Sequence, residues 1–224
     1  MSAAREAILQ RIREATAGAA APAPSPRAYR REGTLDPQAR LDLLCERIGD
    51  YRATVARVKV RRVEGGRLSA DELRGEIEAI LASSGARRIG IPAGLPPEWR
   101  PAGIELVEDV GLTAAELDRL DGVVTGCTVA IAETGTLVLT SGPHEGRRAL
   151  TLVPDLHLCI VEERQIVELV PEAMSSLAGL VRDERRPLTL ISGPSATSDI
   201  ELSRVEGVHG PRTLIVVILV ESLE

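Results

Sequence analysis

Aromatic residues are almost absent from this chain of 224 residues, which has two Tyr, one Trp and no Phe. Single-stranded nucleic acids and carbohydrates are commonly bound by stacking on aromatic side chains, so this scarcity argues against both. An excess of basic residues is missing as well, because the formal net charge is −6. Phosphate backbones attract basic surfaces. We therefore expect no nucleic-acid partner.

Cysteines are few and scattered, at Cys45, Cys127 and Cys159. An odd number without a C-x-x-C pair indicates a reducing compartment and excludes a self-contained four-cysteine zinc or iron–sulfur site of the usual spacing. The longest apolar run, Leu214 to Val220, is too short to span a bilayer. The N-terminus lacks the apolar core of a signal peptide. These absences predict a soluble, cytoplasmic protein without membrane insertion.

The hydrophobic content of 44% is enough for one core and a small appendage. Residues 3–16 carry Ile8, Leu9 and Ile12 at helical spacing, and an Ala/Pro tract that resembles a linker follows. We divide the chain into an N-terminal helix with its linker, residues 1–33, and a main α/β domain, residues 34–224. The helix is either a surface appendage without a role or an element that docks onto a partner.

Helical and strand patterns alternate in the first half of the domain, which predicts an α/β fold with a mainly parallel sheet. Helix start signals stand at Asp36-Pro37, Ser69 and Thr113, and a further helix is predicted over 171–181. The predicted strands are residues 54–60, 88–92, 104–107, 156–161, 188–191 and 214–220. Residues 129–139 predict a hairpin that turns at Thr134-Gly135 and adds an antiparallel element.

The segment Ser-Gly-Pro-Ser-Ala-Thr-Ser-Asp-Ile-Glu, residues 192–201, is the most informative part of the chain. Ser198 and Glu201 have the spacing of a capping box, which predicts that a helix begins here. A strand that turns through small hydroxylic residues into a helix exposes unpaired N–H groups, a generic anion site. Asp199 and His209 add ionisable groups nearby. The alternative is a capped helix without a ligand.

A second candidate segment runs from Thr125-Gly-Cys-Thr128 into Glu133-Thr-Gly-Thr136. Glycines beside a strand permit close approach of a ligand to the backbone. Glu133 at the turn is suited to act as a base, a nucleophile or a hydrogen-bond acceptor. The alternative is a plain turn with a solvated carboxylate.

A third candidate is the loop 141–148, in which His144 and two arginines offer an anion clamp. A flexible loop with ordinary surface charges is the alternative. His157 stands among apolar neighbours, which indicates a packed residue rather than a catalytic one. Cys127 and Cys159 have no sequence cue for thiolate activation, so we expect buried small side chains.

Two other chemistries are disfavoured. His144, His157 and His209 lie at no recognised ligand spacing, so we predict no metal site. Gly193-Pro-Ser195 fails as a nucleophile elbow, because Thr197 stands where the second glycine is needed.

Four motifs follow one another along the chain, at residues 125–136, 150–155, 192–201 and 204–211. The ordered set identifies a family more specifically than any single motif does. Together they resemble the lactate-utilization protein C family, a branch of the LUD (DUF162) group. The resemblance implies a fold similar to the ribose-phosphate isomerase and CoA-transferase (NagB/RpiA) superfamily. It also implies a place in a three-protein system that oxidises L-lactate to pyruvate. The iron–sulfur clusters of that system belong to the two partner proteins, so we expect no cofactor in this chain.

The resemblance leaves two roles open. In one, the chain is an accessory or ligand-binding subunit that holds a small anionic ligand. In the other, it is a stand-alone small-molecule enzyme that uses Glu133, because Glu133-Thr-Gly135 resembles the Glu-x-Gly turn of CoA transferases. The candidate catalytic residues are Glu133, Asp199 and His209. The candidate ligand-binding residues, drawn from the same segments, are Thr125, Gly126, Thr134, Gly135, Thr136, Arg148, Ser192, Gly193, Ser195, Thr197, Ser198, Glu201 and Gly210.

The hypothesis of one shared site makes a geometric prediction. If these segments form one site, then Glu133, Ser195, Thr197, Asp199 and His209 converge around one cleft.

Overall fold

The computed structural model describes residues 3–18, 28–60, 62–63, 67–68, 70–198, 204–206 and 209–221. The chain divides into two compact units, Met1–Arg30 and Arg31–Glu224. The first contains helix α1 (Ala3–Thr16), where the sequence predicts a helix. Most of the predicted Ala/Pro linker lies outside the described residues.

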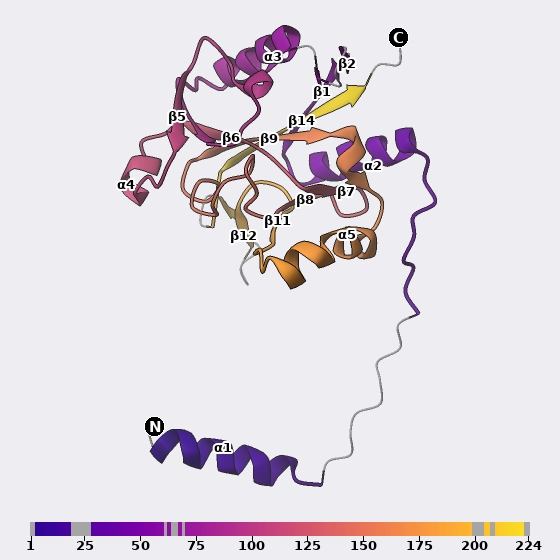
Figure 1. The fold of residues 1–224 in the computed structure, drawn as a ribbon, viewed down its shortest axis with the longest axis vertical. Coiled ribbons are helices and arrows are strands. Elements are labelled where there is room, and N and C mark those ends of the chain that lie inside the picture. Colours follow the sequence, from indigo (N-terminus) through magenta and orange to yellow (C-terminus); the bar gives the residue numbers. More distant parts are fainter. Residues whose placement is uncertain are drawn as a thin grey trace. The chain divides into compact units, whose positions relative to one another are not determined.

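A parallel six-stranded sheet forms the centre of the second unit (Figure 1). Its strands, in spatial order, are β1 (Thr54–Val60), β14 (Thr213–Glu221), β9 (Leu156–Glu162), β6 (Gly122–Gly126), β4 (Arg88–Pro92) and β5 (Glu105–Asp109). The inner strands β9 and β14 are nearly continuous runs of apolar residues because both faces of the sheet are covered. The predicted α/β fold with a mainly parallel sheet is confirmed.

One face of this sheet packs against α3 (Ala70–Ser83) and the short η1 (Pro97–Trp99). The buried side chains of Leu73, Ile77 and Leu81 recur at helical spacing and share a core with Leu158 and Val217. Trp99 closes this core and is 3% exposed.

The other face packs against α2 (Pro37–Asp50) and a smaller second sheet. The Asp36 side chain accepts a hydrogen bond from the Ala39 backbone N–H, so the helix begins where the sequence predicts. The second sheet has the order β10 (Ile166–Val167), β7 (Val129–Ile131), β8 (Thr136–Leu139) and β11 (Thr189–Ile191). The predicted 129–139 hairpin is the antiparallel pair β7–β8.

Helix α5 (Val170–Asp183) covers the outer side of the second sheet, where Leu177 packs with Ile131 and Val138. The remaining short elements are α4 (Ala114–Leu117), η2 (Glu163–Gln165), β2 (Arg62–Val63) and β3 (Arg67–Leu68). The capping box that the sequence predicts at Thr113 is present. None of the helices within the described residues combines the length and apolar character needed to span a bilayer.

The predicted helix would begin after Ser198, within residues 199–203, which lie outside the described residues. The backbone before them forms β12 (Ala196–Ser198), which pairs antiparallel with β13 (Arg204–Glu206). Thr197 stands opposite Val205 in this ribbon, and two β-branched residues favour extended backbone over helix. The described backbone on both sides of the predicted capping box is therefore extended. Asp199 and Glu201 lie outside the described residues.

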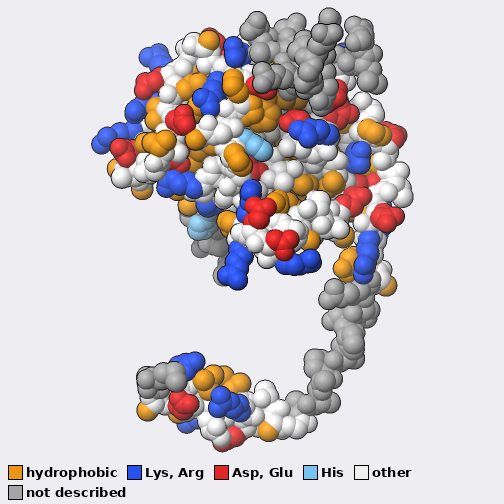
Figure 2. Space-filling view, viewed as in Figure 1, with side chains coloured by type: hydrophobic (Ala, Val, Ile, Leu, Met, Phe, Trp, Pro, Cys, Tyr) orange, Lys and Arg blue, Asp and Glu red, His pale blue; other side chains and the backbone are white. Residues whose placement is uncertain are grey.

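The surface of the second unit mixes charges. On the face shown in Figure 2, basic and acidic side chains alternate among the described residues, without a broad patch of either sign. The acidic net charge is therefore not concentrated on this face.

Candidate ligand-binding cavity

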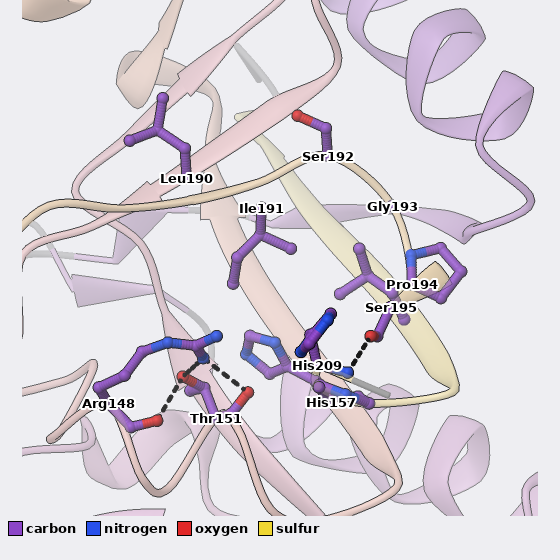
Figure 3. A pocket seen from close by; sticks show the side chains of 13 residues that line it. Arg148, Thr151, His157, Leu190, Ile191, Ser192, Gly193, Pro194, Ser195 and His209 are labelled. Atoms are coloured by element: carbon purple, nitrogen blue, oxygen red, sulfur yellow. Dashed lines mark hydrogen bonds between the residues drawn. The ribbon is translucent and has the colours of Figure 1, made fainter. Parts of the chain in front are cut away.

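A cavity of about 240 Å³ lies where β9 and β14 begin, beneath the loop that follows β11 (Figure 3). Six of the candidate residues from the sequence line it: Arg148, Ser192, Gly193, Ser195, His209 and Gly210. The structure thus brings together the 192–195 loop, the 209–211 segment and one arginine of the 141–148 loop.

Arg148 supplies the cationic group of this cavity. Its Nη1 donates to the Thr151 carbonyl oxygen at 3.1 Å and to Thr151 Oγ1 at 3.2 Å. Partial burial lowers the pKa of Arg148, but a guanidinium titrates so far above neutrality that it stays charged. Among the described residues that line the cavity, none is acidic. The cavity therefore favours an anion.

His157 forms the inner wall, and its side chain is fully buried. Its Nε2 lies 2.7 Å from Thr125 Oγ1, and that hydroxyl donates to the Gly126 carbonyl oxygen at 3.0 Å. The Nδ1 atom has no hydrogen-bond partner among the described residues. The sequence interpretation of His157 as a packed residue is right about burial, but it missed the contact with the cavity. The sequence does hold a signal for this contact, because His157 is a polar residue within an otherwise apolar strand.

Two glycines let the cavity loop and the β7–β8 turn approach the C-terminal end of α2 closely. Gly193 has φ of +87°, and a Cβ atom there would lie 2.4 Å from the Cβ atom of Tyr51. Gly135 has φ of +58°, and a Cβ atom there would lie 2.8 Å from the Arg47 carbonyl carbon. Both positions need glycine for conformation and for space.

Side-chain hydroxyls connect the β7–β8 turn to the cavity loop. Thr136 Oγ1 lies 2.7 Å from Thr134 Oγ1 and 2.7 Å from Ser192 Oγ. Figure 3 shows the Ser192 side chain directed away from His157. At the rim, Ser195 Oγ accepts from the His209 backbone N–H at 2.9 Å. The candidate residues Thr134, Gly135 and Thr136 therefore support the cavity loop and do not line the cavity.

Glu133 does not line the cavity. It is an exposed residue of the β7–β8 turn, where its backbone N–H donates to the Glu168 carbonyl oxygen. The predicted convergence of Glu133 with Ser195 and His209 is therefore not observed. For Thr197 and Ser198 only the backbone is described, in β12.

The other basic residues of the 141–148 loop have different partners. Arg147 binds Asp109 through Nε at 2.8 Å and Nη2 at 2.9 Å. The ring of His144 lies edge-on to Trp99, with centroids 6.3 Å apart, and its Cδ2 would lie 2.7 Å from a Cβ atom at Gly126. Only Arg148 of this loop reaches the cavity, so the predicted clamp of two arginines and His144 does not form.

Cys127 and Cys159 are buried, as the sequence predicts. The neighbouring Cys159 thiol and burial raise the pKa of Cys127 well above its usual value. The Cys159 thiol lies close to His157 and Thr125. The pair lies behind the cavity wall and supports the position of the imidazole.

A family model described as the LUD domain matches residues 97–219, which include the cavity. The chain belongs to the LUD-domain family. It is 50% identical to a lactate utilization protein C of Deinococcus radiodurans over 175 residues, which cover 78% of this chain and 76% of that protein. It is 30% identical to a lactate utilization protein C of Bacillus velezensis over 69% of this chain and 63% of the relative. An uncharacterised Escherichia coli K12 protein, YkgG, is also 30% identical over 78% of this chain and 72% of its own length.

A solved structure agrees with the fold. The crystal structure of a DUF162 family protein from Deinococcus radiodurans matches with a TM-score of 0.69 and 42% sequence identity. The match covers 84% of this chain and all of that one. The resemblance inferred from the four motifs is confirmed.

Proposed function

We propose that this chain is a cytoplasmic component of an L-lactate utilization system, which oxidises L-lactate to pyruvate together with two iron–sulfur partner proteins. The observation that carries the proposal is the 50% identity to a lactate utilization protein C over most of both chains. In this role the chain needs no cofactor of its own, because the clusters reside in the partners.

Within that system, the chain acts as an accessory subunit that holds a small anionic ligand in the cavity beside Arg148. The cationic side chain and the lack of acidic groups among the described lining residues support this assignment. The alternative, a stand-alone enzyme that uses Glu133, has less support because Glu133 does not line the cavity.

Growth on L-lactate as the only carbon source tests the proposal in a strain that lacks this gene and retains the genes of both partners. The unmodified gene restores growth, and Arg148→Met does not. Arg182→Met, which removes an exposed positive charge from α5, is the matched control and restores growth.

Glu133→Gln separates the two roles. An accessory subunit tolerates this change and still restores growth. If Glu133→Gln abolishes growth while Arg148→Met restores it, the enzyme alternative replaces the proposal. Growth of the strain without any copy of the gene contradicts both roles.

A further inference from the structure

The segment 147–153 carries two of the residues that line the cavity, Arg148 and Thr151. It consists of turns, and its backbone hydrogen bonds are local. The Leu150 N–H, for example, donates to the Arg147 carbonyl oxygen at 3.0 Å. The bonds from Arg148 to Thr151 also stay within the segment (Figure 3). None of these bonds fixes the segment to the rest of the fold.

The hydrogen bonds that leave this segment, among the residues that the structure describes, all come from Arg147. Its Nε donates to Asp109 Oδ2 at 2.8 Å, and its Nη2 donates to Asp109 Oδ1 at 2.9 Å. The same Nη2 also donates to the Leu112 carbonyl oxygen. Two parallel bonds between a guanidinium and a carboxylate fix the orientation of both groups. Arg147 therefore sets how the segment is oriented.

Asp109 is a rigid anchor for this arginine. It ends β5 at the edge of the six-stranded sheet, next to α4 (Figure 1). Its carboxylate also accepts from the N–H groups of Gly111 at 3.1 Å and Leu112 at 3.0 Å. The Asp109 side chain is only 2% exposed, so little water is available to replace a lost partner. The contact thus connects the edge of the sheet to the cavity wall.

Apolar packing holds the segment close but does not orient it. Leu150 is fully buried and packs with Leu117, Leu120 and Val123. Hydrophobic burial has no direction, whereas the paired hydrogen bonds of Arg147 do. The next residue is Arg148, whose guanidinium end is directed toward the His157 ring in Figure 3.

We propose that Asp109 is a positioning residue of the cavity, which acts through Arg147 to hold Arg148 where it binds an anion. The inference rests on the proposed function, in which Arg148 holds a small anionic ligand. Asp109 does not line the cavity, so the lining residues alone give it no role.

Isothermal titration calorimetry of the full chain with L-lactate as the probe anion tests the inference. We expect Asp109→Asn and Arg147→Met each to weaken binding about tenfold, because Arg148 remains but is no longer held in place. The matched controls are Glu105→Gln and Arg88→Met, which break the exposed ion pair at the other end of β5 and leave the affinity unchanged.

The sign of the Asp109→Asn effect separates positioning from simple electrostatics. This substitution removes a negative charge, so by charge alone it would strengthen the binding of an anion. Positioning through Arg147 predicts the opposite, a weaker affinity. Arg147→Lys keeps the charge and a donor for Asp109, so we expect it to bind within about threefold of the unmodified chain.

The double variant Asp109→Asn/Arg147→Met tests whether the two residues act through one contact. We expect it to bind about tenfold more weakly than the unmodified chain, as each single variant does, whereas independent effects would multiply to about 100-fold. Thermal melting checks that each variant folds. If Asp109→Asn does not fold, the comparison of Arg147→Met with Arg147→Lys decides the matter, because the Arg147 side chain is 44% exposed.

The outcomes separate the inference from the proposed function. If the unmodified chain does not bind L-lactate, or if Arg148→Met binds it equally well, the ligand-binding role fails and the inference fails with it. If Arg148→Met abolishes binding but Asp109→Asn binds as tightly as the unmodified chain or more tightly, the ligand-binding role stands and the inference is overturned. Losses that multiply in the double variant also overturn it.

Discussion

Glu145 and His157 are both fully buried polar residues, yet their surroundings differ. The Glu145 carboxylate accepts from Thr128 Oγ1, from both the N–H and the hydroxyl of Thr140, and from the Gly142 N–H. His157 makes one bond to Thr125, and its buried Nδ1 has no hydrogen-bond partner among the described residues. A buried group with complete hydrogen bonds stabilises the fold, whereas a buried group that makes a single bond contributes less.

Replacing Glu145 gives the largest expected loss of stability. Glu145→Ala removes four hydrogen bonds to a buried carboxylate, including those from the N–H groups of Thr140 and Gly142, so we expect the unfolding free energy to fall by about 3 kcal/mol or more. Urea unfolding followed by the fluorescence of the buried Trp99, the single tryptophan, measures it. Glu108→Ala, an exposed site on β5, is the control and changes stability by less than about 0.5 kcal/mol. A similar loss in both variants contradicts the structural role of Glu145.

Asp109 is a second carboxylate whose hydrogen bonds are complete, and it is less buried than Glu145. It binds Arg147 and accepts from the N–H groups of Gly111 and Leu112. Burial raises the pKa of Asp109, but these hydrogen bonds outweigh it and hold the pKa below its usual value. The folded state therefore binds fewer protons, so the contribution is complete above the unfolded pKa of about 3.9 and is lost as the pH falls through the folded value.

Asp109→Asn accordingly lowers the unfolding free energy by about 1 kcal/mol at neutral pH, and the difference from the unmodified chain shrinks below about pH 4. Urea unfolding at pH 7, 5 and 3.5 measures it. Glu105→Gln, which breaks the exposed pair with Arg88, is the control and has almost no effect. A difference for Asp109→Asn that stays constant down to pH 3.5 means that the ion pair is not its cause.

Replacing His157 gives the smallest expected loss. His157→Leu removes one hydrogen bond, and Thr125 keeps its bond to the Gly126 carbonyl oxygen. We expect the unfolding free energy to change by less than about 1 kcal/mol, measured in the same urea experiment. A loss as large as that of Glu145→Ala would make His157 a structural residue and remove the contrast between the two sites.

Local sequence signals predicted most of the fold correctly. The alternation of apolar and polar residues located the strands and helices, and Asp36 and Thr113 marked two helix starts through their capping side chains. The helix start indicated by the capping-box spacing at Ser198 stays a prediction, because residues 199–203 lie outside the described residues.

The candidate site was predicted in part. The 192–195 loop, Arg148 and His209 meet at one cavity, because β11 and β14 place their flanking loops side by side. Motif order alone groups Glu133 with them, but Glu133 lies in the β7–β8 turn and does not line the cavity. The sequence predicts His157 only as a packed residue, because apolar neighbours in sequence do not reveal which strand lies beside it.

The sequence by itself determined the α/β class, the positions of the elements, the family and the acidic, aromatic-poor composition, because these depend on local periodicity and on motif text. Only the tertiary structure decided that Thr125 of β6 holds the ring of His157 on β9, and that this ring shares a cavity with Arg148. The physical reason is that such contacts depend on strand order and register, which long-range packing sets and which no local pattern records.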